Sequence, residues 1–164
     1  MLPTKMTEAL NKQFNNEMQA AHAYKAMATY FSDKGYQGFA NFYLVQAKEE
    51  DFHAMKFYHF LVTMGEKPVI RKLEEPKNHF ENAVNVVEES LAQERAVTTD
   101  IYTLATLAEE LKQHSTKTFL DWFIKEQMEE EEAFRLILVK LNGIQEGGEF
   151  FLKMDEDFAQ RTLE

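Results

Sequence analysis

Four segments of the sequence repeat apolar residues at alternating steps of four and three, and each repeat is interrupted near its middle by residues that can bind a metal. Such spacing forms the apolar stripe of a helix packed in a bundle. The interruptions are Glu17 in the first segment, Glu50 and His53 in the second, Glu94 in the third, and Gln127 with Glu130 in the fourth. The pattern predicts a four-helix bundle with polar groups at mid-length.

These polar groups would not be stable in an apolar core without positive charge among them. An ionised carboxylate buried in a low-dielectric interior costs several kcal/mol even after the protein relaxes. Glutamates supply four negative charges, and His53 and Gln127 add neutral donors. Because two divalent metal ions would balance four carboxylates, the charge count predicts a dinuclear site inside the bundle.

The composition favours an all-α fold and limits the ligands of such a site. The chain of 164 residues has the length of a single domain, expected over 1–164, and contains only three prolines and six glycines. Cysteine is absent, which excludes disulfides, zinc–cysteine sites and iron–sulfur clusters. Oxygen and imidazole ligands therefore remain.

Turn signals divide the chain into five predicted helices, at about 5–34, 37–64, 83–113, 115–141 and 149–160. Between the second and third, the periodicity stops, and Pro68 and Pro76 exclude a helix. A helix of about 28 residues is about 42 Å long, whereas about 17 extended residues reach about 56 Å. The connector can therefore return along the whole bundle and join two antiparallel hairpins as one long crossover.

The two predicted hairpins are related by an internal repeat. Glu50 follows Glu17 by 33 positions, and Gln127 follows Glu94 by the same 33. Counted from the bends between the helices, the two members of each pair agree in height within about one turn. The candidate ligands are therefore expected to meet near the middle of the bundle.

Glu50 and His53 form a Glu-x-x-His motif, whose spacing points both side chains from one helix face. The motif alone is common by chance, but here it is coupled to matching positions on three other helices. We expect Glu50 to bridge two metals, Glu17 and His53 to complete the first site, and Glu94, Glu130 and the weak donor Gln127 to form the second. Carboxylates with one imidazole suit manganese or iron, and zinc would also bind.

Charge and hydropathy limit the partners of the chain. A net charge of −10 argues against binding nucleic acid through a basic surface and favours cations as partners. The first residues lack the apolar run of a secretion signal, and no stretch of roughly 18 apolar residues occurs. A cytoplasmic protein without a membrane partner is expected.

The combined pattern resembles the ferroxidase centre of the bacterial non-haem ferritins. The resemblance extends over essentially the whole chain and rests on Glu17, Tyr24, the Glu50 to His53 motif, Glu94, and Gln127-x-x-Glu130. It implies a ferritin-like four-helix bundle with a short fifth helix, assembled into a hollow shell of twenty-four identical subunits. It also implies oxidation of ferrous iron by dioxygen or hydrogen peroxide, and storage of ferric mineral. Neither periodicity nor spacing indicates the shell.

The same resemblance assigns further residues. A third iron site of the family matches Glu49, Glu126, Glu129 and Glu130 in this sequence, and the family's tyrosine near the iron centre, a candidate electron donor, matches Tyr24. Haem-binding relatives carry a methionine where this chain has Phe52, and a second Glu-x-x-His where it has Gln127-x-x-Glu130. The resemblance therefore implies iron without haem.

Two other functions fit the same residues. A di-iron oxygenase or peroxidase would retain its metals as a cofactor and would need a cavity for an organic substrate. A helical scaffold without catalysis would leave the acids solvated or hydrogen-bonded, and metals would not stabilise it. The weak donor Gln127 favours iron storage, because iron that passes through as substrate needs no tight second site.

Overall fold

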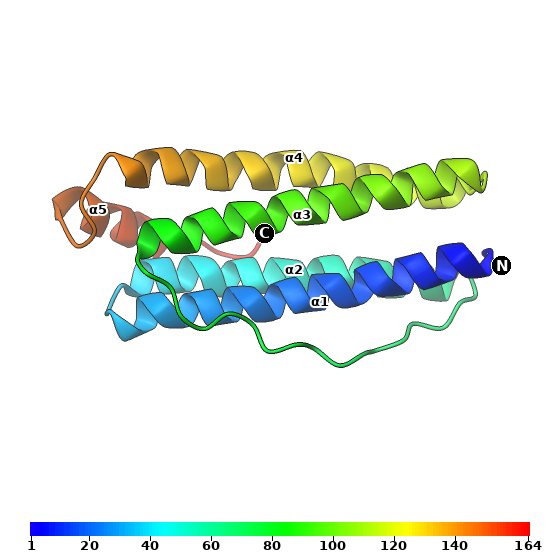
Figure 1. Cartoon of the computed structure of the whole chain (residues 1–164), viewed down its shortest axis with the longest axis horizontal. Coiled ribbons are helices and arrows are strands. Elements are labelled where there is room, and N and C mark those ends of the chain that lie inside the picture. Colours follow the sequence, from blue (N-terminus) through cyan, green and yellow to red (C-terminus); the bar gives the residue numbers. More distant parts are fainter.

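The protein folds into five helices connected by loops, and the computed structural model describes all residues, 1–164. The helices are α1 (Thr4–Asp33), α2 (Gln37–Thr63), α3 (Ala83–Glu110), α4 (His114–Asn142) and α5 (Glu149–Phe158). Figure 1 shows the four long helices side by side and α5 at one end of the bundle. None of the five helices has both the length and the apolar character of a membrane span.

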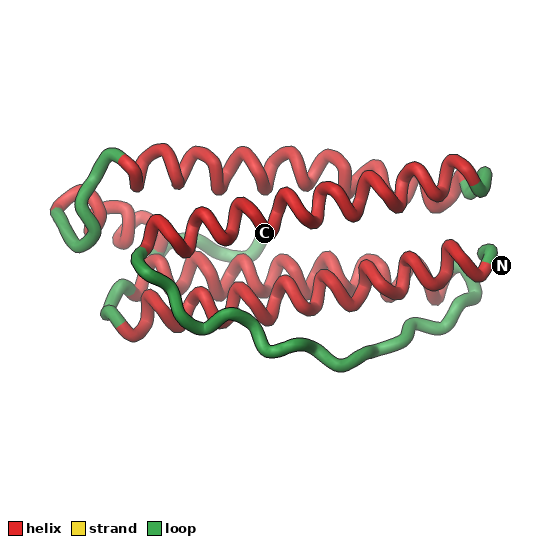
Figure 2. Tube along the Cα trace, viewed as in Figure 1, coloured by secondary structure: helices red, strands yellow, loops and turns green.

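The long helices form two antiparallel hairpins, α1 with α2 and α3 with α4. Figure 2 shows the loop between α2 and α3 running back along the length of the bundle, and the chain contains no strand. As a result, α2 and α3 run in the same direction. The predicted all-α bundle with one long crossover and a short fifth helix is confirmed.

Residues in the left-handed conformation follow three of the long helices. Gly35 after α1 and Gly65 after α2 have φ of 81° and 77°, which glycine adopts without a steric cost. Lys112 takes the same conformation after α3, with φ of 55°. Because no glycine signals this turn, the predicted end of α3 was wrong: the helix ends at Glu110 instead of about 113. The start of α4 at His114 agrees with the predicted start at about 115.

Two apolar clusters fill the bundle on either side of a polar layer at mid-length. In α2, Ala47 belongs to the cluster that also contains Phe151 of α5, and Ala54 belongs to the cluster at the opposite end. Glu50 and His53 lie between these two alanines along the helix. Close packing on both sides therefore fixes the backbone that carries the polar layer.

An amide ladder holds the connector to α1. Asn11, Asn15 and Gln19 lie four residues apart on one helix face, and each side chain both donates to and accepts from connector backbone. The bonds join Asn11 to Lys67 O (3.3 Å) and Val69 N (2.7 Å), Asn15 to Val69 O (2.8 Å) and Arg71 N (2.8 Å), and Gln19 to Glu74 O (3.0 Å) and Glu74 N (2.8 Å). The ladder pairs backbone groups of a segment that lacks secondary structure.

Asn15→Ala is expected to destabilise the protein by about 1 kcal/mol, because it removes both bonds to the connector and leaves partly buried backbone groups of Val69 and Arg71 without these partners. Denaturant unfolding of the metal-free protein measures the change. Asn16→Ala is the matched control, since the Asn16 side chain bonds to Gln13 of the same helix at 3.4 Å. Equal stability of the two variants would contradict a role for the ladder.

Candidate metal centre

Side chains from all four long helices reach the polar layer. Those of Glu17, Glu50, His53, Glu94, Gln127 and Glu130 belong to residues that are only 1–6 % exposed. Their seam positions point them inward, because the alternating spacing of four and three residues keeps each of them on the buried face of its helix. The bundle therefore contains four buried carboxyl groups and one imidazole at mid-length.

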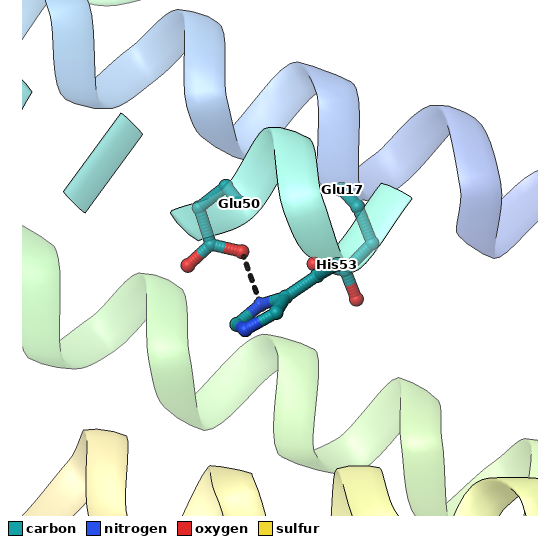
Figure 3. A group of neighbouring side chains, drawn as sticks. All are labelled: Glu17, Glu50 and His53. Carbon is teal, nitrogen blue, oxygen red and sulfur yellow. Dashed lines mark hydrogen bonds and ion pairs between the residues drawn. The ribbon is translucent and has the colours of Figure 1, made fainter. Parts of the chain in front are cut away.

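Glu17 from α1 forms a compact group with Glu50 and His53 from α2. One ligand atom of each residue lies within 4.8 Å of those of the other two, and His53 Nδ1 is 3.2 Å from Glu50 Oε2. Figure 3 shows the three side chains converging on the side of α1 and α2 that faces the other hairpin. Two carboxylates and an imidazole in this arrangement fit one divalent cation.

One oxygen of this group has no partner in the protein. Glu17 Oε1 accepts a hydrogen bond from Gln13 Nε2 at 2.9 Å, whereas Glu17 Oε2 is buried and makes none. An unsatisfied buried acceptor costs about 1–3 kcal/mol, and more when it is charged. A bound cation would remove this cost, so both the donor set and the orphaned oxygen fit a metal ion.

Neutral groups hold Glu94 from two sides. Tyr24, fully buried, donates its hydroxyl to Glu94 Oε1. Gln127 donates from Nε2 to Glu94 Oε2 at 3.0 Å and to the Glu94 backbone carbonyl at 3.2 Å. The amide nitrogen of Gln127 thus faces Glu94, and Gln127 positions that carboxylate.

Glu130 is grouped with His53 and Glu126. One ligand atom of each lies within 4.8 Å of the others, and His53 Nε2 is 3.6 Å from Glu126 Oε1. We expected Glu130 to share a site with Glu94 and Gln127. Glu130 stays close enough to Glu94 for the charge of Glu94, after burial, to raise its pKa. Glu126 also reaches His53, because it lies one turn before Glu130 on α4, so that the imidazole has an acid beside each of its nitrogens.

Glu49 and Glu129 lie outside the buried layer. Glu49 is half-buried and accepts a hydrogen bond from Arg161 Nη2 at 3.0 Å, whereas Glu129 is exposed. Together with Glu126 and Glu130, they line an open cavity of about 540 Å³. The four acids of the predicted third site therefore share one cavity, although only Glu126 and Glu130 belong to a compact group.

Burial and the crowding of charges shift several pKa values. Burial and repulsion from Glu94 raise the pKa of Glu50 well above its ordinary value. Burial also raises the pKa of Glu94, and it raises that of Glu130 to about 8. Burial lowers the pKa of His53, but the carboxylates of Glu126 and Glu50 beside its two nitrogens outweigh this effect and raise it to about 11. The metal-free site therefore holds protons at neutral pH.

We expect the metal-free protein to lose a few kcal/mol of stability as pH rises from about 6 to about 8. The pKa of Glu130 is about 8 in the folded protein and near its ordinary 4.5 in the unfolded chain, so folded Glu130 binds the extra proton over this range. The unfolded state binds fewer protons, and stability must then fall with rising pH. The raised pKa of His53 acts in the same direction, between 6.5 and about 11.

Denaturant unfolding in the presence of a chelator, at several pH values, tests this expectation. Glu130→Gln serves as the comparison, because it keeps the shape of the side chain without its titration and should flatten the dependence. Zinc ions should displace the protons and stabilise the protein more strongly at the higher pH. An identical pH dependence in the original protein and the variant would show that Glu130 does not titrate in this range.

The sequence pattern did not identify the residues that support the ligands. Gln13 and Gln46 are buried, and each lies one turn before a ligand: Gln13 bonds to Glu17, and Gln46 Nε2 bonds to Glu130 Oε2 at 2.9 Å. Buried glutamines four positions before Glu17 and Glu50 were a usable signal. Arg161 approaches from outside the bundle, and no spacing rule indicates it.

Known proteins share both the sequence and the fold. The family described as the ferritin-like domain matches residues 7–144. A bacterial non-haem ferritin from Staphylococcus saprophyticus is 40% identical over 164 residues, which cover 100% of this chain and 98% of the relative. The corresponding protein of Staphylococcus aureus (strain USA300) is 38% identical over 100% of this chain and 99% of its own.

Solved ferritin structures superpose closely on the whole chain. An Archaeoglobus fulgidus ferritin, engineered into a closed form by site-directed mutagenesis, has a TM-score of 0.98 and 35% identity, with 100% of both chains covered. The open-pore ferritin of the same archaeon has a TM-score of 0.96 and 35% identity, with 98% of each chain covered. The chain belongs to the ferritin family, and its sequence groups it with the bacterial non-haem ferritins.

Proposed function

We propose that this protein oxidises ferrous iron at a dinuclear centre within each subunit and stores the ferric product as mineral. The observation that carries the proposal is the group of Glu17, Glu50 and His53, with an oxygen of Glu17 buried and unpartnered. Membership in the ferritin family supports iron as the metal. Iron is the substrate of this reaction, and the centre needs no haem.

The buried side chains divide into two adjoining sites. Glu17, Glu50 and His53 would bind the first ferrous ion, and Glu94 with Glu130 and Gln127 would bind the second. Glu50 is the candidate bridge, because it belongs to the compact group of the first site and also lies near Glu94, whose charge adds to burial in raising the pKa of Glu50. Binding of two dications would neutralise the four glutamates and release their protons.

The reaction balances with dioxygen as oxidant. Two ferrous ions each give one electron to dioxygen, and with four water molecules the products are two ferric oxyhydroxide units, one hydrogen peroxide and four protons. Hydrogen peroxide can replace dioxygen by accepting the same two electrons. The carboxylates favour this direction, because hard anionic oxygen ligands stabilise ferric iron more than ferrous iron.

Tyr24 is a further candidate for electron transfer. Its hydroxyl donates to Glu94, and burial together with the charge of Glu94 raises its pKa well above the ordinary value. Tyr24 therefore stays protonated beside the second site. Loss of one electron from the phenol, with transfer of its proton to Glu94, would supply an additional reducing equivalent.

Storage of the mineral requires that the subunits assemble into a shell and that ferric iron can leave the dinuclear centre. We propose a cytoplasmic shell of twenty-four subunits, in keeping with the ferritin structures that match the chain. The cavity lined by Glu49, Glu126, Glu129 and Glu130 would hold a third iron, since it adjoins the buried layer through Glu130 and opens to solvent. Weak binding of the second and third ions suits iron in transit.

Aerobic addition of ferrous iron to the metal-free protein tests the proposed function. Ferric absorbance should rise rapidly up to about two irons per chain, and the particle should then accept far more iron as soluble mineral, without a change in outer size. Saturation at two retained irons, with no mineral, would instead identify an oxygenase or peroxidase that keeps its metals. Slow oxidation at the rate of free iron would reject both activities.

A further inference from the structure

The C-terminal residues after α5 run back to the bundle and place the positively charged side chain of Arg161 at the cavity lined by Glu49, Glu126, Glu129 and Glu130, called the acidic cavity below. Figure 1 shows the C-terminal end lying back toward the middle of the bundle. Arg161 Nη2 donates to Glu49 Oε2 at 3.0 Å and to Gln46 Oε1 at 2.8 Å, while Nη1 donates to the Phe42 backbone carbonyl at 3.0 Å. Its guanidinium lies 4.1 Å from the centre of the Phe42 ring.

Hydrogen bonds from α2 also hold the backbone of this C-terminal arm, residues 159–164, close to Arg161. Asn41 Nδ2 donates to the carbonyl oxygens of Phe158 and Arg161, both at 3.0 Å. Phe158 packs on the Phe42 ring, with ring centres 4.7 Å apart. Residues of α2 therefore hold both the backbone and the guanidinium of Arg161, which keeps the side chain beside Glu49.

Arg161 is the only basic residue that lines the cavity. The remaining charged residues there are Glu49, Glu126, Glu129, Glu130 and Glu164. Three of the four carboxylates of the proposed third site each have a partner in the protein: Arg161 for Glu49, His53 for Glu126 and Gln46 for Glu130. The fourth, Glu129, is exposed. The cavity keeps a net negative charge, so it still attracts a divalent cation, but Glu49 is already paired.

We propose that Arg161 is a tethered counter-ion that competes with a divalent cation for Glu49, and so weakens the outer site. The inference rests on the proposed function, because it concerns the third iron of that centre. A cation can bind Glu49 together with Glu126 and Glu130 only after the guanidinium releases Glu49. Competition of this kind would keep iron from being trapped beside the dinuclear centre.

Gln46 connects this competition to the buried layer. Its side-chain oxygen accepts from Arg161, while its nitrogen donates to Glu130 Oε2 at 2.9 Å and lies 3.5 Å from Glu50 Oε1. Release of Arg161 frees the oxygen of Gln46 but leaves its two links to the ligands in place. The effect of Arg161 is therefore expected on the outer site and not on the first two metals.

Zinc titration of the metal-free protein by calorimetry tests the proposal, because zinc is redox-inert and reports binding without oxidation. The sites that fill after the first two metals per chain should bind zinc about tenfold more tightly in Arg161→Gln, the effect of one charge-assisted hydrogen bond. Arg161→Lys keeps the charge but loses the forked bonds, so it should strengthen zinc binding at these sites less than Arg161→Gln does. Arg71→Gln, a loss of charge in the connector, should change nothing.

The outcomes separate this inference from the proposed function. Unchanged affinity of the later sites in Arg161→Gln, with the first two zinc ions still bound, would overturn the counter-ion role alone. Equal effects of Arg161→Gln and Arg161→Lys would also overturn it, because they would trace the change to anchoring of the arm rather than to charge. Absence of the first two zinc sites in the original protein would reject the dinuclear centre itself.

Discussion

Glu17→Ala and His53→Ala variants are expected to lose rapid oxidation of ferrous iron by about a hundredfold or more while remaining folded. Each change removes one ligand from the compact group with Glu50, and loss of even a supporting contact costs about 10–100-fold at a metal site. Folding should persist, because Glu17→Ala deletes a buried carboxyl group, one oxygen of which has no hydrogen-bond partner. Initial rates of ferric absorbance, with circular dichroism for folding, measure both effects.

The control for this experiment is Glu8→Ala, which removes an exposed glutamate from the same helix. Its initial rate should stay within about twofold of the original protein. Zinc should raise the thermal midpoint of the control more than that of Glu17→Ala, because linkage requires binding to the folded state and the variant lacks one ligand of the first site. Oxidation at the original rate in both Glu17→Ala and His53→Ala would refute the assigned centre.

Gly38→Ala is expected to destabilise the protein by about 3 kcal/mol and to release α5 from the bundle. Alanine normally stabilises a helix by about 1 kcal/mol relative to glycine. At Gly38, however, an added Cβ would lie 1.5 Å from the backbone oxygen of Asp155 in α5. A backbone group cannot move aside as a flexible side chain can, and overpacking of this kind costs about 1–3 kcal/mol or more.

Hydrogen exchange locates this effect. The Phe39 N–H donates to Asp155 Oδ1 at 2.8 Å, so release of α5 should speed exchange at Phe39 and throughout Glu149–Phe158. Gly143→Ala is the matched control, because its Cβ would meet nothing closer than Lys140 O at 3.7 Å. The same exchange pattern in both variants would show that α5 tolerates the added carbon. Oxidation at the proposed dinuclear centre should survive in Gly38→Ala, since α1 to α4 carry its candidate ligands.

The fold and the position of the centre were predictable because both follow from local repetition. A helix returns to the same face every 3.6 residues, so the spacing of apolar residues determines which side is buried. A glutamate on that side, such as Glu17 or Glu94, is then buried, and this holds whichever residues of the other helices pack against it. The matching distances within the two hairpins determined that these residues would share one height.

The arrangement of the supporting groups was not predictable from the same rules. Glu126 was expected only in an outer site, yet it lies beside His53, and Gln127 turns its amide nitrogen toward Glu94. Side-chain rotamers decide such pairings, and rotamers respond to whatever packs against them from other helices. The sequence spacing restricts each ligand to a face of its helix but leaves its partner open.

Sequence periodicity was enough to predict an all-α bundle with a crossover and a buried set of candidate metal ligands, because helix periodicity and the cost of buried charge act within short segments. The contacts between distant segments became visible in the folded chain alone: the ladder from Asn11 to Gln19 on the connector, the close approach of α5 to Gly38, and Arg161 beside Glu49. These contacts join residues more than fifty positions apart, and no periodic pattern encodes them. They depend on the path of the folded chain, which brings Arg161 back to the acidic cavity.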